Sequence, residues 1–535
     1  AIQARGGSLL VSAAAGSGKT RVLVERVAGL ITDPDHPGDA DSLLIMTFTN
    51  AAAAKLRADI TKRLAAEIRQ HPQDVRLRRQ QMQRASIGTV DAFCLHFVQQ
   101  NFSALDVPPD FTIADDATLV RLQQETLSTV LEQAYTDPDF CAFADLYDRG
   151  RTDDTTGRAV QELYHFTQAL PHPAQALQRF VEMWQSDAPP EKTQWGQAVL
   201  RETSARIKGV LRLLRTAQKI AAKDPAADKA LTAVLMDDED RMLLVLDRLD
   251  HGAWDTVPEA LDNADNWRRA GRVPGGIASN IAAMSANMLR DRAKKQIATL
   301  KTDFLLCPAA DYQADRRRAA PLVAALVRAV EQYRRTLLEA KLAEKVLDYA
   351  DLEHMTLELL LTPEYERTSL CRTVSARYSA VLVDEYQDTN ALQDAIYFAL
   401  AAPDASNLFF VGDIKQSIYR FRQADPSVFV GKQTAWQPYP ADAPVPYPEP
   451  ATIALDANFR SAPDVIRGIN YFFETFFSRR LGGIDYGDGQ RLVVGRKDET
   501  YPGLCELDVI READTAADAR TIAARIAQMM ADGYP

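Results

Sequence analysis

The chain has 535 residues, a net charge of −11 and a pI near 5.3. Its overall charge therefore does not point to a polyanionic partner, although an acidic protein can still carry a local basic groove. Its 46% apolar and 25% charged residues are typical of a globular protein with three or four domain-sized units. No apolar run reaches the roughly 18 residues of a membrane span.

The five cysteines are far apart in the sequence and include no CxxC pair. They therefore predict neither a disulfide framework nor a zinc site, and they fit a reducing, cytoplasmic environment. The sequence opens directly on a strand pattern and stops just after a helical one, so we expect no signal peptide and interpret both ends as cuts within a longer protein. The cysteines are Cys94, Cys141, Cys307, Cys371 and Cys505.

The first 105 residues alternate between strand and helix patterns. Short apolar runs at 9–13, 42–48 and 85–90 predict buried strands, and the segments after them predict helices, the first over 21–31. This β-α-β-α-β-α order is typical of a parallel sheet covered by helices on both faces. We therefore predict an α/β fold with a parallel sheet.

A phosphate-binding loop is predicted between the first strand and the first helix. Glycines there let backbone N–H groups approach phosphate oxygens without interference from a Cβ atom. The Lys19 side chain would reach the β- and γ-phosphates, the Thr20 hydroxyl would hold Mg²⁺, and the helix N-terminus would add its unpaired N–H groups. The usual pattern has glycine where Ala13 stands, and the alternative is a flexible glycine turn. The candidate nucleotide-binding residues are Ala13, Ala14, Gly16, Ser17, Gly18, Lys19 and Thr20.

Residues 106–345 have a different character, with amphipathic helices and no strand signal. We predict an all-helical domain inserted between two segments of the sheet domain, 1–105 and 346–445. The stretch 288–345 is basic, and solvated helix faces are the alternative to a DNA-binding surface there.

Strand patterns return at 380–383 and 408–411, and the first of these runs into Asp384-Glu385. Ligands of parallel sheets bind at the carboxyl ends of strands. Because a phosphate loop is predicted in the same fold, Asp384 would order Mg²⁺. Glu385 would lie near the same metal and would orient the attacking water. The Pro-rich segment 437–450 is the expected linker, and the strand at 452–455 is expected to begin a second α/β unit over 446–535, which stops unfinished.

Six sequence blocks occur in the order found in superfamily 1A DNA helicases of the UvrD/Rep type, and together they resemble that family over residues 1 to about 470. The last three blocks look closest to AddA-type helicase–nuclease subunits, which work with AddB, and are also similar to RecB. The blocks are AAAGSGKTR, TFTNAAAAKLR, IGTVDAFC, VLVDEYQDTN, VGDIKQSIYRFRQADP and LDANFRS.

The resemblance implies further roles around ATP. Gln416 would sense the γ-phosphate, and Gln387 would link hydrolysis to movement. Arg460 would reach the γ-phosphate from the second α/β domain as an arginine-finger equivalent. Phe459 would stack on adenine, with Arg21 close to the base.

The resemblance also implies a surface for single-stranded DNA. Base stacking on aromatic rings is worth about 1–3 kcal/mol per base and tolerates any sequence, and Phe48 as a core residue is the alternative to Phe48 on DNA. Where many relatives carry histidine, this chain has Asp91, whose carboxylate would repel phosphate and is expected to cap the next helix instead. The candidate DNA-binding residues are Phe48, Thr49, Asn50, Thr89, Tyr419, Phe421 and Arg422.

The family resemblance implies a RecA-like, phosphate-loop fold for the sheet domain and the start of a second RecA-like domain over 446–535. It also implies an ATP- and Mg²⁺-dependent 3′→5′ helicase motor, the N-terminal part of a helicase–nuclease that processes double-strand breaks with an AddB-like partner. The adenine-reading glutamine, the later helicase motifs and the nuclease domain would lie outside the sequence. The alternatives are a stand-alone UvrD/PcrA-type helicase, a nucleotide- and DNA-binding module without motor activity, and a phosphate-loop ATPase that acts on protein.

Overall fold

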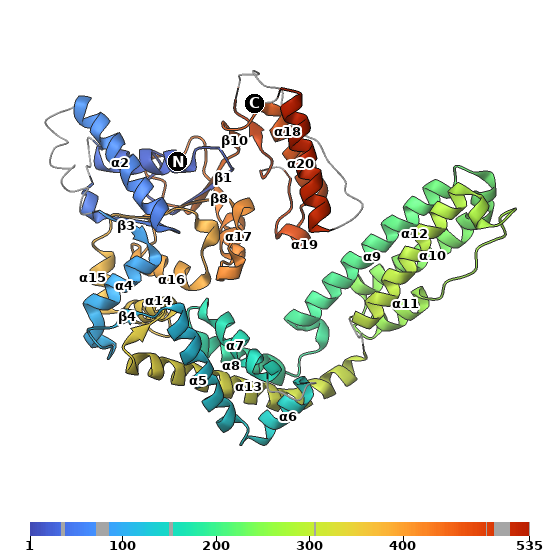
Figure 1. Ribbon diagram of the computed structural model, residues 1–535, viewed down its shortest axis with the longest axis horizontal. Coiled ribbons are helices and arrows are strands. Elements are labelled where there is room, and N and C mark those ends of the chain that lie inside the picture. The colour runs from blue at the N-terminus through green and yellow to red at the C-terminus, as the bar shows by residue number, and fades with distance from the viewer. Residues whose placement is uncertain are drawn as a thin grey trace. The chain divides into compact units, whose positions relative to one another are not determined.

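The computed structural model describes residues 1–33, 38–70, 85–148, 154–303, 307–487, 489–496 and 514–533, and Figure 1 draws its helices and strands. The chain folds into two compact units. The first contains Ala1–Asp115, Gln168–Pro171 and Lys341–Pro535, and the second contains Asp116–Thr167 and His172–Ala340. Within the described ranges, no helix is long and apolar enough to cross a membrane.

A parallel sheet forms the centre of the first unit, which confirms the predicted α/β class. Among the described residues its strand order is β3-β2-β6-β7-β1-β9-β8, and each neighbouring pair of strands runs parallel. The strands are β1 (Leu9–Ala13), β2 (Leu43–Thr47), β3 (Ser86–Thr89), β6 (Ala380–Val383), β7 (Leu408–Gly412), β8 (Gln437–Pro438) and β9 (Ala451–Leu455).

Helices cover both faces of this sheet because its strands alternate apolar side chains between two cores. Leu9 and Val11 of β1 pack with the helices of one face, α1 (Lys19–Ile31) and α2 (Asn50–Gln70). On the other face Phe410 of β7 stacks on Tyr386 at 4.1 Å between ring centroids. The other helices of the unit are α4 (Val90–Asn101), α14 (Tyr349–Leu360), α15 (Ser369–Ser375), α16 (Ala391–Leu400), α17 (Pro426–Ala435), α18 (Pro463–Phe476), α19 (Arg479–Gly482) and α20 (Thr515–Ala531).

The strand β9 corrects the expected start of a second α/β unit. It pairs with β1 from Leu9↔Ala451 to Ala13↔Leu455, so it belongs to the first sheet. The Pro-rich segment before it joins β8 to β9 inside that sheet and is no interdomain linker. After β9, the described residues form one separate parallel pair, the short strands β10 (Ala457–Asn458) and β11 (Val493–Val494). A second RecA-like domain stays a prediction, and its start moves past Leu455.

Another short parallel pair, β4 (Thr112–Ile113) with β5 (Val346–Leu347), lies where the chain leaves and re-enters the first unit. The strand β4 falls inside the stretch predicted to be wholly helical, because a two-residue strand leaves no alternating pattern to detect. The four described cysteines are free, and Cys505 lies outside the described residues.

The second unit is built from helices. Three long helices, α9, α10 and α12, run side by side (Figure 1) and share one apolar core. Its helices, two of which extend into the first unit, are α5 (Asp116–Ala134), α6 (Pro138–Tyr147), α7 (Asp154–Gln168), α8 (Pro173–Gln185), α9 (Gln194–Ala221), α10 (Pro225–His251), α11 (Thr256–Ala264), α12 (Ile281–Asp303) and α13 (Ala309–Ala343).

Two arginines of the basic stretch 288–345 are buried, which neither interpretation of that stretch foresaw. The Arg290 guanidinium bonds both carboxylate oxygens of Asp238, at 2.6 and 3.3 Å, and the Arg268 carbonyl at 2.8 Å. Arg316 donates to the backbone carbonyls of Met183 and Ala188. These two side chains are enclosed in the helical unit and are not available to a ligand.

Candidate functional site

The phosphate loop lies between β1 and α1, as predicted. Gly16 and Gly18 have φ values of +71° and +92°, a backbone conformation that side chains with a Cβ rarely adopt. A Cβ on Gly16 would also come within 2.9 Å of the Arg460 Cβ. The helix begins at Lys19 without a side-chain cap, so its first N–H groups remain available to an anion.

Lys19 connects the phosphate loop to the Asp384-Glu385 pair. Its Nζ donates to Glu385 Oε2 at 3.0 Å and to Gln416 Oε1 at 3.4 Å. The two sequence motifs, 366 residues apart, therefore meet in space as the motif argument requires. Thr20 follows Lys19 in the first turn of α1.

The carboxylate pair directly follows β6, and the backbone of Glu385 is strained. Glu385 has φ 51° and ψ 41°, the left-handed region, which costs a non-glycine residue of order 1–3 kcal/mol. The Asp384 carboxylate accepts the Glu385 N–H at 3.0 Å. Burial, with the negative charge of Glu385 adding to it, raises the pKa of Asp384 to about 6. A carboxylate destabilised in this way gains from a cation placed beside it.

Gln387 is 2% exposed and holds the two halves of the site together. Its Nε2 donates to Glu385 Oε2 at 2.9 Å and to Asp388 Oδ2 at 3.1 Å, and its Oε1 accepts the Asp413 N–H at 2.9 Å. One amide therefore connects Glu385 to Asp413, the residue that directly follows β7. Burial, with the Glu385 charge, also raises the pKa of Asp388 to about 6.

Asp413 and Lys415 are functional candidates that the sequence reasoning missed. Asp413 Oδ2 accepts the Gln416 Nε2–H at 2.8 Å, which leaves Gln416 Oε1 facing Lys19. Lys415 Nζ lies 2.8 Å from Asp413 Oδ1 and donates to Gln490 Oε1 at 3.1 Å. The available signal was a pair of charged residues, Asp413 and Lys415, just after an apolar strand and just before Gln416.

Asn458 fixes the segment with Phe459 and Arg460 against the phosphate loop. Its Nδ2 donates to the Ala15 carbonyl at 2.8 Å, and its Oδ1 accepts the N–H groups of Arg460 and Ser461, both at 2.8 Å. The Phe459 N–H donates to the Gly16 carbonyl at 3.0 Å. The resemblance implies that Arg460 reaches the site from a second domain, but this segment belongs to the same compact unit as the loop.

Some of the residues predicted around the nucleotide have exposed side chains, and others are held within the phosphate loop and β1. The Phe459 ring is 60% exposed and the Arg460 and Arg21 side chains are exposed, so they are free for a ligand. Ser17 Oγ is buried without a hydrogen-bond partner in the described part of the chain. Ala13 is the last residue of β1, and the Ala14 N–H donates to the Leu455 carbonyl at 2.8 Å.

Four of the predicted DNA-binding residues form an aromatic–arginine cluster, namely Phe48, Tyr419, Phe421 and Arg422. The Phe48 and Tyr419 ring centroids are 4.7 Å apart, and those of Tyr419 and Phe421 are 5.8 Å apart. The Arg422 guanidinium lies 5.5–6.0 Å from all three rings. Phe421 is 76% exposed and Phe48 is half-buried, so Phe48 is a surface-cluster residue and no core residue.

The remaining DNA candidates lie at helix starts. Thr49 Oγ1 accepts the Ala52 N–H at 3.1 Å, and Asn50 is the exposed first residue of α2. Thr89 is buried, and its hydroxyl accepts the Ala92 N–H at 3.1 Å. Thr89 is therefore the N-cap of α4, and the expectation that Asp91 caps this helix is wrong.

Asp91 instead forms a carboxyl pair with Glu353 of α14. Its side chain is hydrogen-bonded to Glu353 and lies within electrostatic range of Arg422. Gln393 Nε2 donates to Glu353 Oε1 at 2.8 Å. Burial, with the Asp91 charge adding to it, raises the pKa of Glu353 to about 8. Two carboxyl groups in this contact share a proton near neutral pH.

The residues present fit a nucleotide with its magnesium ion. A glycine loop, an uncapped helix start, Lys19 and the unpartnered Ser17 hydroxyl provide donors for phosphate oxygens. Within the described ranges, no three His, Cys, Asp or Glu side chains come together as a metal centre. Mg²⁺ in such sites needs only one or two carboxylates, because phosphates and waters complete its ligands.

The parallel sheet, the phosphate loop after β1 and the acidic pair after β6 define a phosphate-loop nucleotide-binding protein of the RecA-like class. The family model of the UvrD/REP helicase N-terminal domain matches residues 1–437. The chain therefore belongs to the UvrD/REP helicase family.

Curated relatives agree with this assignment. The chain is 33% identical over its whole length to an ATP-dependent helicase/nuclease subunit from Anoxybacillus flavithermus, of which it covers 46%. It is 34% identical over 93% of its length to the protein of the same name from Moorella thermoacetica, of which it covers 36%. The chain spans less than half the length of these relatives.

Proposed function

We propose that the chain is the ATP-driven motor portion of an AddA-type helicase–nuclease, which moves 3′→5′ along single-stranded DNA. The observation that carries this proposal is the contact of Lys19 with Glu385 and Gln416, at 3.0 and 3.4 Å. Of these residues, Gln416 is close in sequence to the aromatic–arginine cluster. Only two residues separate Gln416 from Tyr419 of that cluster. A nucleotide-dependent shift of Gln416 is thus passed directly to the DNA-binding loop.

The proposed hydrolytic step uses the residues of this site. Thr20 and Asp384 would hold Mg²⁺, which supplies charge neutralisation for the phosphates. Nζ of Lys19 is engaged with Glu385, and we infer that Lys19 turns from this carboxylate to the phosphates when the nucleotide binds. The released Glu385 then orients the attacking water, and Arg460 adds positive charge at the γ-phosphate.

We infer that movement along DNA uses the same hydrogen bonds. Glu385, Gln387 and Asp413 form one continuous chain from β6 to β7, and Asp413 holds Gln416. We infer that the change of partner by Lys19 alters this chain and repositions Tyr419 and Arg422 on the DNA strand. Closure of a second RecA-like domain on ATP, and its opening after hydrolysis, would complete each step.

We infer for the full-length protein a nuclease activity and an AddB-like partner protein, as the names of its relatives suggest. Its substrates would be DNA ends, in the cytoplasm, and its role the processing of double-strand breaks for recombinational repair.

The experiment that tests the motor measures ATP hydrolysis by the full-length protein with and without single-stranded DNA, and displacement of streptavidin from biotinylated oligonucleotides. We expect DNA to stimulate hydrolysis and streptavidin to leave the 5′ end, as 3′→5′ movement requires. An equal rate of ATP hydrolysis with and without DNA would favour an ATPase that acts on protein. Displacement from the 3′ end would reverse the polarity, and DNA binding without displacement would leave only a binding module.

A further inference from the structure

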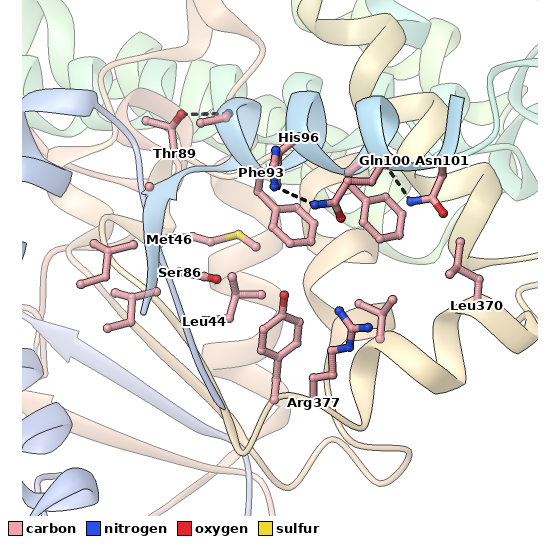
Figure 2. Close-up of a pocket in the computed structure, with 17 residues that line it drawn as sticks. Leu44, Met46, Ser86, Thr89, Phe93, His96, Gln100, Asn101, Leu370 and Arg377 are labelled. Carbon is pink, nitrogen blue, oxygen red and sulfur yellow. Dashed lines mark hydrogen bonds between the residues drawn. The ribbon is translucent and has the colours of Figure 1, made fainter. Parts of the chain in front are cut away.

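A cavity of about 440 Å³ opens between α4, α15 and the strands β2 and β3. The residues assigned above to ATP hydrolysis are not among the described residues that line it. Figure 2 shows Phe93, His96 and Gln100 reaching into it from α4, Leu44 and Met46 from the sheet, and Leu370 and Arg377 from the α15 side. A cavity of this size is in the range of small-molecule sites.

The walls of the cavity suit a flat, apolar body. The Phe93 and Phe97 rings of α4 lie nearly parallel, at 13° and 5.7 Å between centroids, and present one aromatic side. Leu44 and Met46 of β2 lie on another side. Gly88 pairs with Met46 in the parallel sheet and adds no side chain, so the floor between these walls stays open.

Among the described residues that line the cavity, Arg377 alone has a formally charged side chain. Within the described residues no ion pair engages its guanidinium, which is exposed. No aspartate or glutamate of the described chain lines the cavity. Tyr378 lies beside Arg377, and its hydroxyl is hydrogen-bonded to Ser86. The cavity therefore combines aromatic and aliphatic walls with one unpaired cation at its rim, an arrangement that favours a single negative charge.

We propose that this cavity is a binding site for a planar aromatic monoanion, such as an aryl carboxylate or aryl sulfonate. The ring system lies between the α4 aromatics and β2, and the anionic group pairs with Arg377. A nucleotide is a poorer match, because its phosphate carries up to two charges and usually takes several donors or a helix N-terminus, whereas this cavity offers one guanidinium. The proposal is independent of the motor function.

The test uses two naphthalene probes that differ in charge: anilinonaphthalene sulfonate, an anion, and N-phenyl-naphthylamine, its neutral analogue. We expect both to gain fluorescence with the folded chain. Arg377→Met keeps the aliphatic stem and removes the charge, so the anionic probe should bind about tenfold more weakly while the neutral probe changes less than about twofold. Arg372→Met is the matched control, since Arg372 lies on α15 but does not line the cavity.

A second variant locates the probes. Gly88→Leu places a side chain on the face of the sheet that carries Met46, and a Cβ there meets only Ala92 at 3.8 Å. It should abolish binding of both probes without loss of secondary structure by circular dichroism. Unchanged binding in Gly88→Leu, equal effects of Arg377→Met and Arg372→Met, or stronger competition by AMP than by naphthoate would each overturn the proposal.

Discussion

Buried charge is arranged in opposite ways at two places, around Asp238 in the helical unit and around Asp384 and Asp388 in the sheet unit. In the helical unit, Asp238 receives Arg290 on both oxygens and also Arg241 at 2.8 Å, so its charges are closely paired. In the sheet unit, no cation of the described residues is in hydrogen-bond contact with the buried Asp384 or Asp388, and the Asp388 Oδ1 atom has no partner there. The arrangement around Asp238 is a closed network, in which the buried charges have partners. The arrangement around Asp384 and Asp388 is an open site, in which buried carboxylates lack partners and can bind a ligand.

The largest effect is expected at the open site. Lys19→Ala should lower DNA-stimulated ATP hydrolysis by about 10³-fold, because it removes the positive charge that serves the phosphates. Lys294→Ala is a matched control, since Lys294 also forms an ion pair at 3.0 Å, with Asp291, but on an exposed helix face. Steady-state hydrolysis measures both. Wild-type turnover in Lys19→Ala would refute the assignment of the site.

At the closed network the loss should appear in stability. Arg290→Leu leaves the buried Asp238 with less compensation and should cost about 3–5 kcal/mol of unfolding free energy. The double variant Arg290→Leu/Asp238→Leu should recover part of this loss, because no half of the pair is then left alone. Urea unfolding followed by circular dichroism is the measurement. A single variant as stable as wild type would show that the pair adds nothing.

The exposed aromatic cluster should matter for DNA and not for folding. Phe421→Ala should weaken binding of single-stranded oligonucleotides by about 1–3 kcal/mol, the worth of one stacked base, with unchanged thermal stability. Phe166→Ala removes a ring of similar exposure, 67% against 76%, from the helical unit. Fluorescence anisotropy should separate the two variants, and equal affinities would remove the cluster from the DNA surface.

The carboxyl pair Asp91–Glu353 should make stability depend on pH. The pKa of Glu353 is raised to about 8 in the folded chain from a usual 4.5, so the folded state binds the extra proton. Stability is then fully present below about pH 4.5 and is lost as pH rises through 8. Glu353→Gln mimics the protonated form and should be more stable than wild type at pH 8.5, by on the order of 1–3 kcal/mol, and equal at pH 5. Thermal unfolding at both pH values checks this, and parallel curves would contradict it.

The smallest effect is expected where charge is paired but exposed. Arg317 and Asp187 are 2.9 Å apart, with 69% and 75% of their side chains exposed. Arg317→Ala should change the unfolding free energy by less than about 0.5 kcal/mol. A larger loss in the same urea assay would mean that burial does not decide how much an ion pair contributes to stability.

Local patterns predicted the parts of the fold that are local. The phosphate loop and the apolar strands at 9–13 and 380–383 follow from short runs with fixed spacing, and so does the meeting of Lys19 with Glu385. The pairing of β9 with β1 could not be predicted in this way, because nothing in an isolated strand states its neighbour.

The misses at the site have the same origin. Thr89 and Asp91 both suit a helix start, and only backbone angles decide between them. Arg290 resembles a surface charge until Asp238, 52 residues away, is placed beside it. Asn458 sits in a recognised block, yet its hold on the Ala15 carbonyl depends on three-dimensional contact.

The position of β1 in the sheet also sets an order of events during synthesis. This strand lies between β7 and β9, which leave the ribosome only after residues 412 and 455 have been made. Until then the first apolar strand has neither of its hydrogen-bonding neighbours, whereas the intervening helices can already pack on one another. The nascent β1 segment must therefore be shielded from aggregation throughout that interval, and the nucleotide pocket can form only after it ends.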